Sequence, residues 1–138
     1  MADDILTIDR LIVRSGRIEC TVSLAPGAPR FMTGAWAAEL KRTFPDIGRH
    51  ACVNDEGTTF SAVADRTSLP HVLEHVVIDL QVHDSSAAGL EDAFYVGTTE
   101  WLDETRTKAR VEVSFTDDLV ALRCFRDAAN FINRMVVT

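Results

Sequence analysis

The N-terminal part of the chain alternates apolar and polar residues. In residues 17–24 every second residue, from Ile18 to Leu24, is apolar. This spacing places the apolar side chains on one face of an extended backbone and predicts a half-buried strand. The preceding segment alternates in a similar way, and residues 14–16 (Arg-Ser-Gly) supply a turn. We therefore expect an antiparallel hairpin over residues 5–24.

Two helices are predicted in the middle of the chain. Residues 34–44 carry Trp, Leu and Phe at i, i+4 and i+8 and stop before Pro45, which disfavours helical backbone in the residue before it. Residues 69–82 are apolar at helical spacing, and Ser68 is a candidate N-cap. The polar or irregular segments that follow these helices are expected to be loops: 46–58 and 84–97.

A third strand and a last helix complete the pattern. Apolar residues alternate with polar ones over 111–115, and Asp117 or Asp118 can cap a helix that runs through Val136. The order of elements is β-β-α-α-β-α, which leaves no room for repeated βαβ units. We therefore predict one α+β domain over residues 1–138, with an antiparallel or mixed sheet and helices packed on it.

Charge and hydropathy narrow the classes of partner. The 138 residues hold 14 Lys and Arg against 21 Asp and Glu, a net charge of −7, and no densely basic segment. This balance argues against nucleic-acid binding. The longest apolar stretches are about five residues, far below the roughly 20 that span a bilayer, and the chain starts with acidic residues where a signal peptide is basic. We expect a cytoplasmic protein without membrane or nucleic-acid partners.

Three cysteines, Cys20, Cys52 and Cys124, are an odd number and form no C-x-x-C motif. This usage suggests neither a disulfide framework nor a zinc site built on cysteines. We expect three buried thiols.

The helix predicted over residues 69–82 carries the most distinctive chemistry. His71, Glu74 and His75 fall on one helical face, and two imidazoles at i and i+4 can both reach one Zn²⁺. A carboxylate beside them can take a proton from water, which is the H-x-x-E-H arrangement of inverted zinc peptidases. Ile78 and Val82 continue the same face, so we expect the three polar groups to line a pocket rather than open surface.

The pattern alone leaves two interpretations open. The first is a metal site, for which the helix itself supplies no third ligand. The second is a buried, hydrogen-bonded His-Glu-His cluster that stabilises the fold.

Further motifs flank this helix. They are Phe-Pro-Asp-Ile-Gly-Arg-His-Ala-Cys over 44–52, Phe-Ser-Ala-Val over 60–63 and Thr-Ser-Leu-Pro over 67–70. Together with His-Val-Leu-Glu-His over 71–75 and the Leu-Gln pair after it, they resemble the N-terminal domain of cyanophycin synthetases. The resemblance covers residues 35–135. Because the 138 residues do not include the ATP-grasp and ligase-like domains of those enzymes, we expect a stand-alone relative.

The resemblance implies an α+β domain that acts as a small metallopeptidase in members that keep H-x-x-E-H. There it cuts a polymer of aspartate and arginine, whereas other members use the domain for polymer binding or scaffolding. By this resemblance His71 and His75 are metal ligands, with zinc as the expected ion, and Glu74 is the general base. His50 and Cys52 match a His-x-Cys of the family, and for them we expect packing or loop tethering rather than ligation.

Two departures from the family bear on the site. Its turn at residues 97–100 usually carries basic residues, whereas Thr98 and Glu100 stand here, which argues against cyanophycin as the substrate. Thr98, Thr99 and Glu100 are kept as candidate substrate contacts. The family glutamate is expected near Ser114, but the acid here is Glu112, two residues earlier on the same strand face. Glu112 is therefore the candidate third metal ligand.

Two functional hypotheses follow. The first is a metal-dependent peptidase or amidase acting on a small peptide or isopeptide, with basic or arginine-bearing substrates favoured by weak electrostatic steering. The second is a non-catalytic binding or scaffold module that keeps the fold and a structural His-Glu-His cluster. A chain of this size has little room for a deep cleft, so a homo-oligomer that completes the site is also expected.

Overall fold

A four-stranded antiparallel sheet forms one layer of the protein in the computed structural model, which describes residues 4–54, 57–89 and 94–137. The spatial order of its strands is β1, β2, β6, β5. Their bounds are β1 Leu6–Arg14, β2 Arg17–Leu24, β5 Gly97–Trp101 and β6 Lys108–Ser114. The arrangement confirms the predicted α+β class and the N-terminal hairpin.

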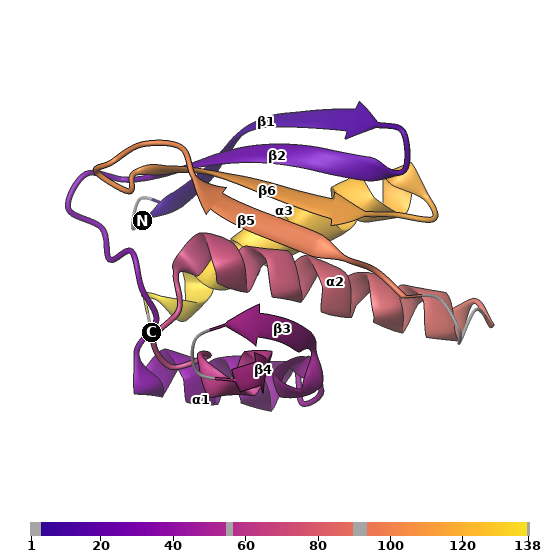
Figure 1. The fold of residues 1–138 in the computed structure, drawn as a ribbon, viewed down its shortest axis with the longest axis horizontal. Coiled ribbons are helices and arrows are strands. Elements are labelled where there is room, and N and C mark those ends of the chain that lie inside the picture. Colours follow the sequence, from indigo (N-terminus) through magenta and orange to yellow (C-terminus); the bar gives the residue numbers. More distant parts are fainter. Residues whose placement is uncertain (1–3, 55–56, 90–93, 138) are drawn as a thin grey trace.

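Helices cover one face of this sheet (Figure 1). The helices are α1 Gly34–Thr43, α2 Leu69–Ala87 and α3 Asp118–Met135. Helix α2 contacts β5, β6 and α3, and α1 lies farther from the sheet, where it contacts α3. A small second hairpin, β3 Ala51–Asn54 and β4 Gly57–Thr59, lies on the side of α2 away from the sheet (Figure 1). Short 3-10 turns flank it: Ile47–Arg49 and Phe60–Ala62.

The central strands show the alternation that the sequence predicts. In β2 and β6 every second residue is buried, as in Ile18, Val111 and Val113, and these side chains face the helices. The intervening polar residues lie on the solvent-facing side, the usual arrangement of an antiparallel sheet covered on one face. This alternation fixes which face each residue of β6 occupies.

Helix α2 is buried on both sides because it lies between the sheet and the β3–β4 hairpin. Ser68 caps it as predicted, since the Ser68 hydroxyl accepts a hydrogen bond from the backbone N–H of His71. The helix runs five residues beyond the predicted end at position 82. Ser85, in this extension, is buried and hydrogen-bonded to the Tyr95 hydroxyl, and the first left-handed residue comes only at Gly89 (φ 84°).

Two segments contain strands that the sequence analysis did not predict. Part of the expected loop 46–58 forms β3 and β4, which pair over only a few residues, and β5 begins at Gly97, the last residue of the expected loop 84–97. Residues 55–56 and 90–93 of those loops lie outside the described residues. The sequence of β5, Gly-Thr-Thr-Glu-Trp, has threonines suited to a strand but no apolar alternation. An edge strand needs none, because only part of it is buried.

In the described part of the chain, the helices are too short or too polar for any of them to cross a membrane.

Candidate metal site

The H-x-x-E-H face of α2 borders a cavity of about 490 Å³. Helix α2 contributes His71, Glu74 and His75, β5 contributes all its residues from Gly97 to Trp101, and Ala51 and Cys52 come from β3. The cavity thus opens between the sheet edge, the helix and the small hairpin. The expectation that the three polar groups of the helix line a pocket is therefore met.

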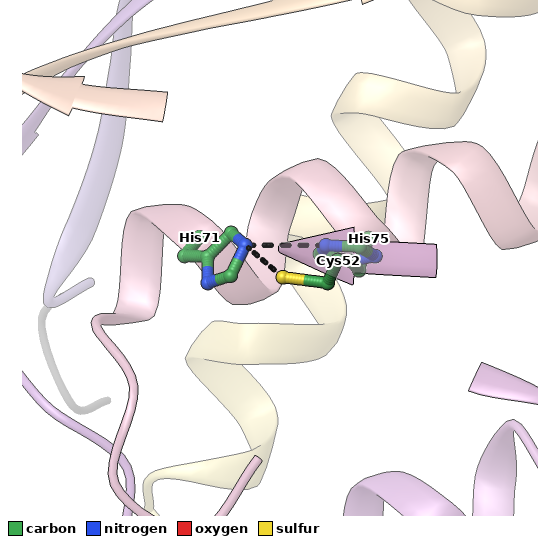
Figure 2. A group of neighbouring side chains, drawn as sticks. All are labelled: Cys52, His71 and His75. Carbon is green, nitrogen blue, oxygen red and sulfur yellow. Dashed lines mark hydrogen bonds between the residues drawn. The ribbon is translucent and has the colours of Figure 1, made fainter. Parts of the chain in front are cut away.

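Three donor atoms from two elements meet at this cavity. The Nε2 atoms of His71 and His75 lie 3.1 Å apart, and Cys52 Sγ lies 3.5 Å from His71 Nε2 (Figure 2). All three donors lie within 4.8 Å of one another. Tetrahedral zinc, with Zn–N near 2.0–2.1 Å and Zn–S near 2.3 Å, requires about 3.3 Å between nitrogens and about 3.6 Å between nitrogen and sulfur. The cluster could therefore bind a metal ion.

The imidazole of His71 is oriented for ligation by the residue before the helix cap. The Thr67 hydroxyl lies 2.7 Å from His71 Nδ1. A hydrogen bond on Nδ1 fixes the ring and leaves Nε2 directed at the cluster, as outer partners of metal-bound histidines commonly do. Burial lowers the pKa of His71, which favours the neutral form that a metal requires.

His75 is held by a chain of two further groups, the partly buried His50 and the buried Asp79. His75 Nδ1 lies 3.1 Å from His50 Nδ1, and His50 Nε2 lies 3.1 Å from Asp79 Oδ1. The Asp79 carboxylate selects the His50 tautomer that has its proton on Nε2, so His50 Nδ1 accepts a hydrogen bond from the Nδ1–H of His75. The Nε2 lone pair of His75 is then free to face His71 and Cys52. Burial, followed by the neighbouring His71 and His50, lowers the pKa of His75 to about 2.

The second oxygen of Asp79 faces His83. His83 Nε2 lies 3.2 Å from Asp79 Oδ2, within ion-pair distance but without hydrogen-bond alignment, so Oδ2 is buried without a hydrogen-bond partner among the described residues. Asp79 is only 1% exposed. A buried carboxylate needs such cationic or donor partners, which explains why His50 and His83 flank it.

Glu74 lies beside the donor cluster. Its Oε2 is 3.6 Å from His75 Nε2, and its Oε1 accepts a hydrogen bond of 2.6 Å from the Thr99 hydroxyl. Burial raises the pKa of Glu74 to about 7, with the Thr99 hydrogen bond and His50 opposing the shift. A carboxylate with a pKa near neutrality can both accept and return a proton.

Close approach of β5 to Glu74 depends on the glycine at the start of the strand. A Cβ atom at Gly97 would lie 2.7 Å from Glu74 Cγ and 3.0 Å from the carbonyl oxygen of Glu112. Any larger residue would push the strand and the carboxylate apart. Gly97 is therefore required by contact, not by an unusual backbone angle.

Glu112, the expected third ligand, is not placed with the imidazoles. It alternates with buried Val111 and Val113 and so lies on the solvent-facing side of β6. There its carboxylate is within ion-pair distance of Arg17 (3.8 Å) and Arg110 (4.0 Å). The third donor near His71 and His75 is instead Cys52, for which the sequence analysis expected packing or tethering.

The three expected substrate contacts of β5 all border the cavity, in different ways. Thr99 directs its hydroxyl at Glu74. Thr98 and Glu100 are exposed and belong to the opposite strand face, where Glu100 pairs with Arg110. Of the three, Thr99 alone contacts the candidate catalytic group.

Sequence reasoning missed Cys52, Thr67 and the His50–Asp79 pair as parts of the site. The signal for Asp79 was present, because it stands four residues after His75 on the same helical face. The signal for Cys52 was its spacing of two from His50, which on a strand would put both side chains on one face. The sequence analysis set ligation aside because it found no second pair of donors to join His50 and Cys52.

Comparison with known proteins identifies a family. The family model described as Cyanophycin synthase-like N-terminal domain matches residues 30–137. No curated protein and no solved structure matches the chain.

Proposed function

The chain belongs to the cyanophycin synthase-like N-terminal domain family, and from this premise we propose that it is a metal-dependent hydrolase of peptide or isopeptide bonds. One observation carries the proposal: a buried carboxylate, Glu74, lies directly beside a Cys-His-His donor cluster on the wall of an open cavity. Three protein donors with a fourth position open to a cavity are typical of catalytic zinc sites.

Cys52, His71 and His75 would hold the ion. A bound zinc ion supplies Lewis-acid activation of a water molecule and of the scissile carbonyl. Glu74 accepts the proton of the attacking water at Oε2, the oxygen that Thr99 does not bond, while the carbon–oxygen bond forms. It then delivers that proton to the amine nitrogen as the carbon–nitrogen bond breaks, so that hydrolysis consumes one water and leaves Glu74 unchanged.

Neighbouring residues set the position of the base. Thr99 donates a hydrogen bond to Oε1 of Glu74, so Oε2 remains available to the water. Oε2 lies 3.6 Å from His75 Nε2. Thr67 and His50 orient the two imidazoles. With a net charge of −7, the protein would favour basic or arginine-bearing substrates through long-range steering. A reducing, cytoplasmic location would keep the Cys52 sulfur available as a ligand.

Metal content and turnover test the proposal together. Untagged protein purified without chelator should carry about one metal ion per chain, as in a single three-donor site. Glu74→Gln should keep that metal and reduce hydrolysis of arginine-containing peptides by about 10²–10⁴-fold. The matched control is Glu104→Gln, which alters an exposed glutamate away from the cavity. Full turnover by purified Glu74→Gln protein would exclude the catalytic role.

A second candidate is supported by the buried network itself. His50, His75 and Asp79 are linked to one another by hydrogen bonds, which fits a structural cluster in a binding or scaffold module. In that case metal is absent even after zinc is added, no hydrolysis is detected, and substitution of His75 only lowers the melting temperature. The two outcomes separate the candidates.

A further inference from the structure

Strand β5 has one unpaired side. It is an edge strand that pairs with β6, and the hydrogen bonds at both ends of this ladder show which residues face β6. The N–H of Leu102 donates to Lys108, and the N–H of Ser114 donates to Val96. Because antiparallel ladders alternate, even-numbered residues of β5 direct their N–H and C=O groups at β6.

The odd-numbered residues therefore present their backbone to the open edge. Gly97, Thr99 and Trp101 direct N–H and C=O groups away from β6, and among the backbone hydrogen bonds of the described residues those groups have no partner. These three residues also line the cavity that holds the donor cluster. The open edge thus offers a row of three donor–acceptor pairs along the candidate catalytic site.

A second cavity extends the first along the same strand. It measures about 640 Å³, and Ala51, Glu74, His75 and Gly97 border both cavities. The second cavity continues past Gly97 beside residues 94–96, and its walls are largely apolar, with Ile78, Val82, Phe94 and Val96 among them. The two cavities therefore adjoin at Glu74 and His75, one on each side of the candidate base.

We propose that the protein binds its substrate as an extended peptide strand added to the open edge of β5. The inference rests on the proposed function for the location of the reacting bond and deepens it by naming the substrate class: main-chain peptide rather than side-chain isopeptide. Five residues from Gly97 to Trp101 span about 16 Å at roughly 3.3 Å each, which matches about five substrate residues. Main-chain hydrogen bonds hold the peptide, and the flanking cavities take alternate side chains.

The geometry favours a peptide backbone for a specific reason. Edge N–H and C=O groups alternate at strand spacing, and only another extended backbone pairs with all three residues at once. A side-chain amide on a flexible stem pairs with one of them at most. The edge also runs past Glu74 rather than ending there, so a bond within a chain, not at its tip, reaches the base.

Amide hydrogen exchange tests the mode of binding directly. The probe is a pool of capped hexapeptides randomised among Arg, Ala, Val and Thr, added at millimolar concentration to full-length Glu74→Gln protein, which would bind peptide without cutting it. Exchange at the amides of Gly97, Thr99 and Trp101 should slow by at least about tenfold, as newly bonded strand amides do. The amides of Thr98 and Glu100, already bonded to β6, should not change. Unchanged exchange at all three odd-numbered positions, or equal slowing throughout β5, would overturn the proposal.

A pair of variants at one position isolates the backbone contribution. Trp101→Pro removes an N–H that points to the open edge, which an edge strand tolerates because no ladder bond is lost. Trp101→Ala removes the same ring and keeps the N–H. Peptide affinity should fall at least about fivefold further in the proline variant than in the alanine variant, which corresponds to one main-chain hydrogen bond. Equal affinities in two folded variants would contradict the edge-pairing mode.

The amide-exchange experiment, together with the metal and hydrolysis assays, also separates this inference from the proposed function. Edge protection without metal or hydrolysis would leave a peptide-binding module and exclude the hydrolase. Hydrolysis without edge protection would leave the hydrolase and exclude the added strand.

Discussion

Two groups of ionisable residues lie on opposite faces of the same sheet, and they behave differently. On the solvent-facing side, Arg17, Glu19, Arg110 and Glu112 form a network of ion pairs at partly exposed positions. On the helix-covered side, the cluster around His75 is buried and joined by directed hydrogen bonds.

The difference between the two faces indicates which ionisable groups can act as bases or metal ligands. Exposed ion pairs are screened by water, so each contributes little to stability. In the buried cluster the ionisable groups lose hydration, which moves the pKa values of His71, Glu74 and His75. A carboxylate on the outer face is thus a surface charge, whereas Glu74 is a base whose pKa of about 7 lies near neutral pH.

The largest expected contrast is in metal affinity. His71→Ala removes one of three donors and should weaken metal binding by more than about 100-fold, beyond the loss seen for outer partners of a metal site. Glu112→Ala, on the outer face, should leave the affinity unchanged. Competition with a chromogenic chelator measures both, and a loss of equal size in Glu112→Ala would mean that Glu112 reaches the metal after all.

Loss of the carboxylate behind His50 should have the next largest effect. Asp79→Asn keeps the size of the side chain but weakens its hold on His50 Nε2, so His75 is no longer kept in one tautomer. We expect metal affinity to fall by about 10- to 100-fold. His83→Gln is the control, because His83 is exposed and touches only the far oxygen of Asp79. Unchanged affinity in Asp79→Asn would remove this pair from the site.

Replacing a glutamate by glutamine should have opposite effects on stability in the two groups of residues. Burial raises the pKa of Glu74 to about 7, so the folded state disfavours its charge, and stability is lost as pH rises from the ordinary value near 4.5 towards 7. In chelator-treated protein at pH 8, Glu74→Gln should therefore raise the free energy of unfolding, by about 1–3 kcal/mol.

Glu19 on the outer face should show the reverse sign. A hydrogen bond from Arg14 lowers the pKa of Glu19 in the folded state. The ionised Glu19 therefore stabilises the fold above its ordinary pKa, and this stabilisation is lost as pH falls through the folded-state pKa. Glu19→Gln should slightly lower the melting temperature at pH 8, and added salt should shrink the difference. Denaturant and thermal unfolding of both variants provide the comparison. A loss of stability in Glu74→Gln would contradict the distinction between the faces.

Packing at the start of β5 gives a further test of stability. Gly97→Ala places a methyl group against Glu74 and should cost about 1–3 kcal/mol of stability together with a shift of the Thr99 contact. Gly34→Ala is the matched control, since a methyl group there meets no atom within 4 Å. Urea unfolding measures both, and equal stability of the two variants would show that β5 moves aside freely.

The fold was predictable where burial alternates along an element. The strict period of two over 17–24 and the capped helix after Asp117 gave the hairpin and α3 because half of each element faces the core. Strand β5 escaped prediction because an edge strand with threonines is stabilised by pairing with β6, a contact between distant residues that local pattern does not carry.

The site was predictable where one helix supplies it. His71, Glu74 and His75 share a helical face by spacing alone, and the structure keeps them together. Cys52 comes from a different element, so its approach depends on how the small hairpin packs on α2. The alternation in β6 already indicated that Glu112 lies on the solvent-facing side. The prediction that it is a metal ligand followed the family pattern instead.

X-ray absorption at the metal edge tests the central claim, that Cys52 joins His71 and His75 in one site, most directly. Zinc-loaded protein should show one sulfur neighbour at about 2.3 Å and nitrogen or oxygen neighbours at about 2.0–2.1 Å. The sulfur neighbour should disappear in Cys52→Ser and persist in Cys124→Ser, which alters a buried cysteine elsewhere in the core. A wild-type spectrum with only nitrogen and oxygen neighbours would contradict the account.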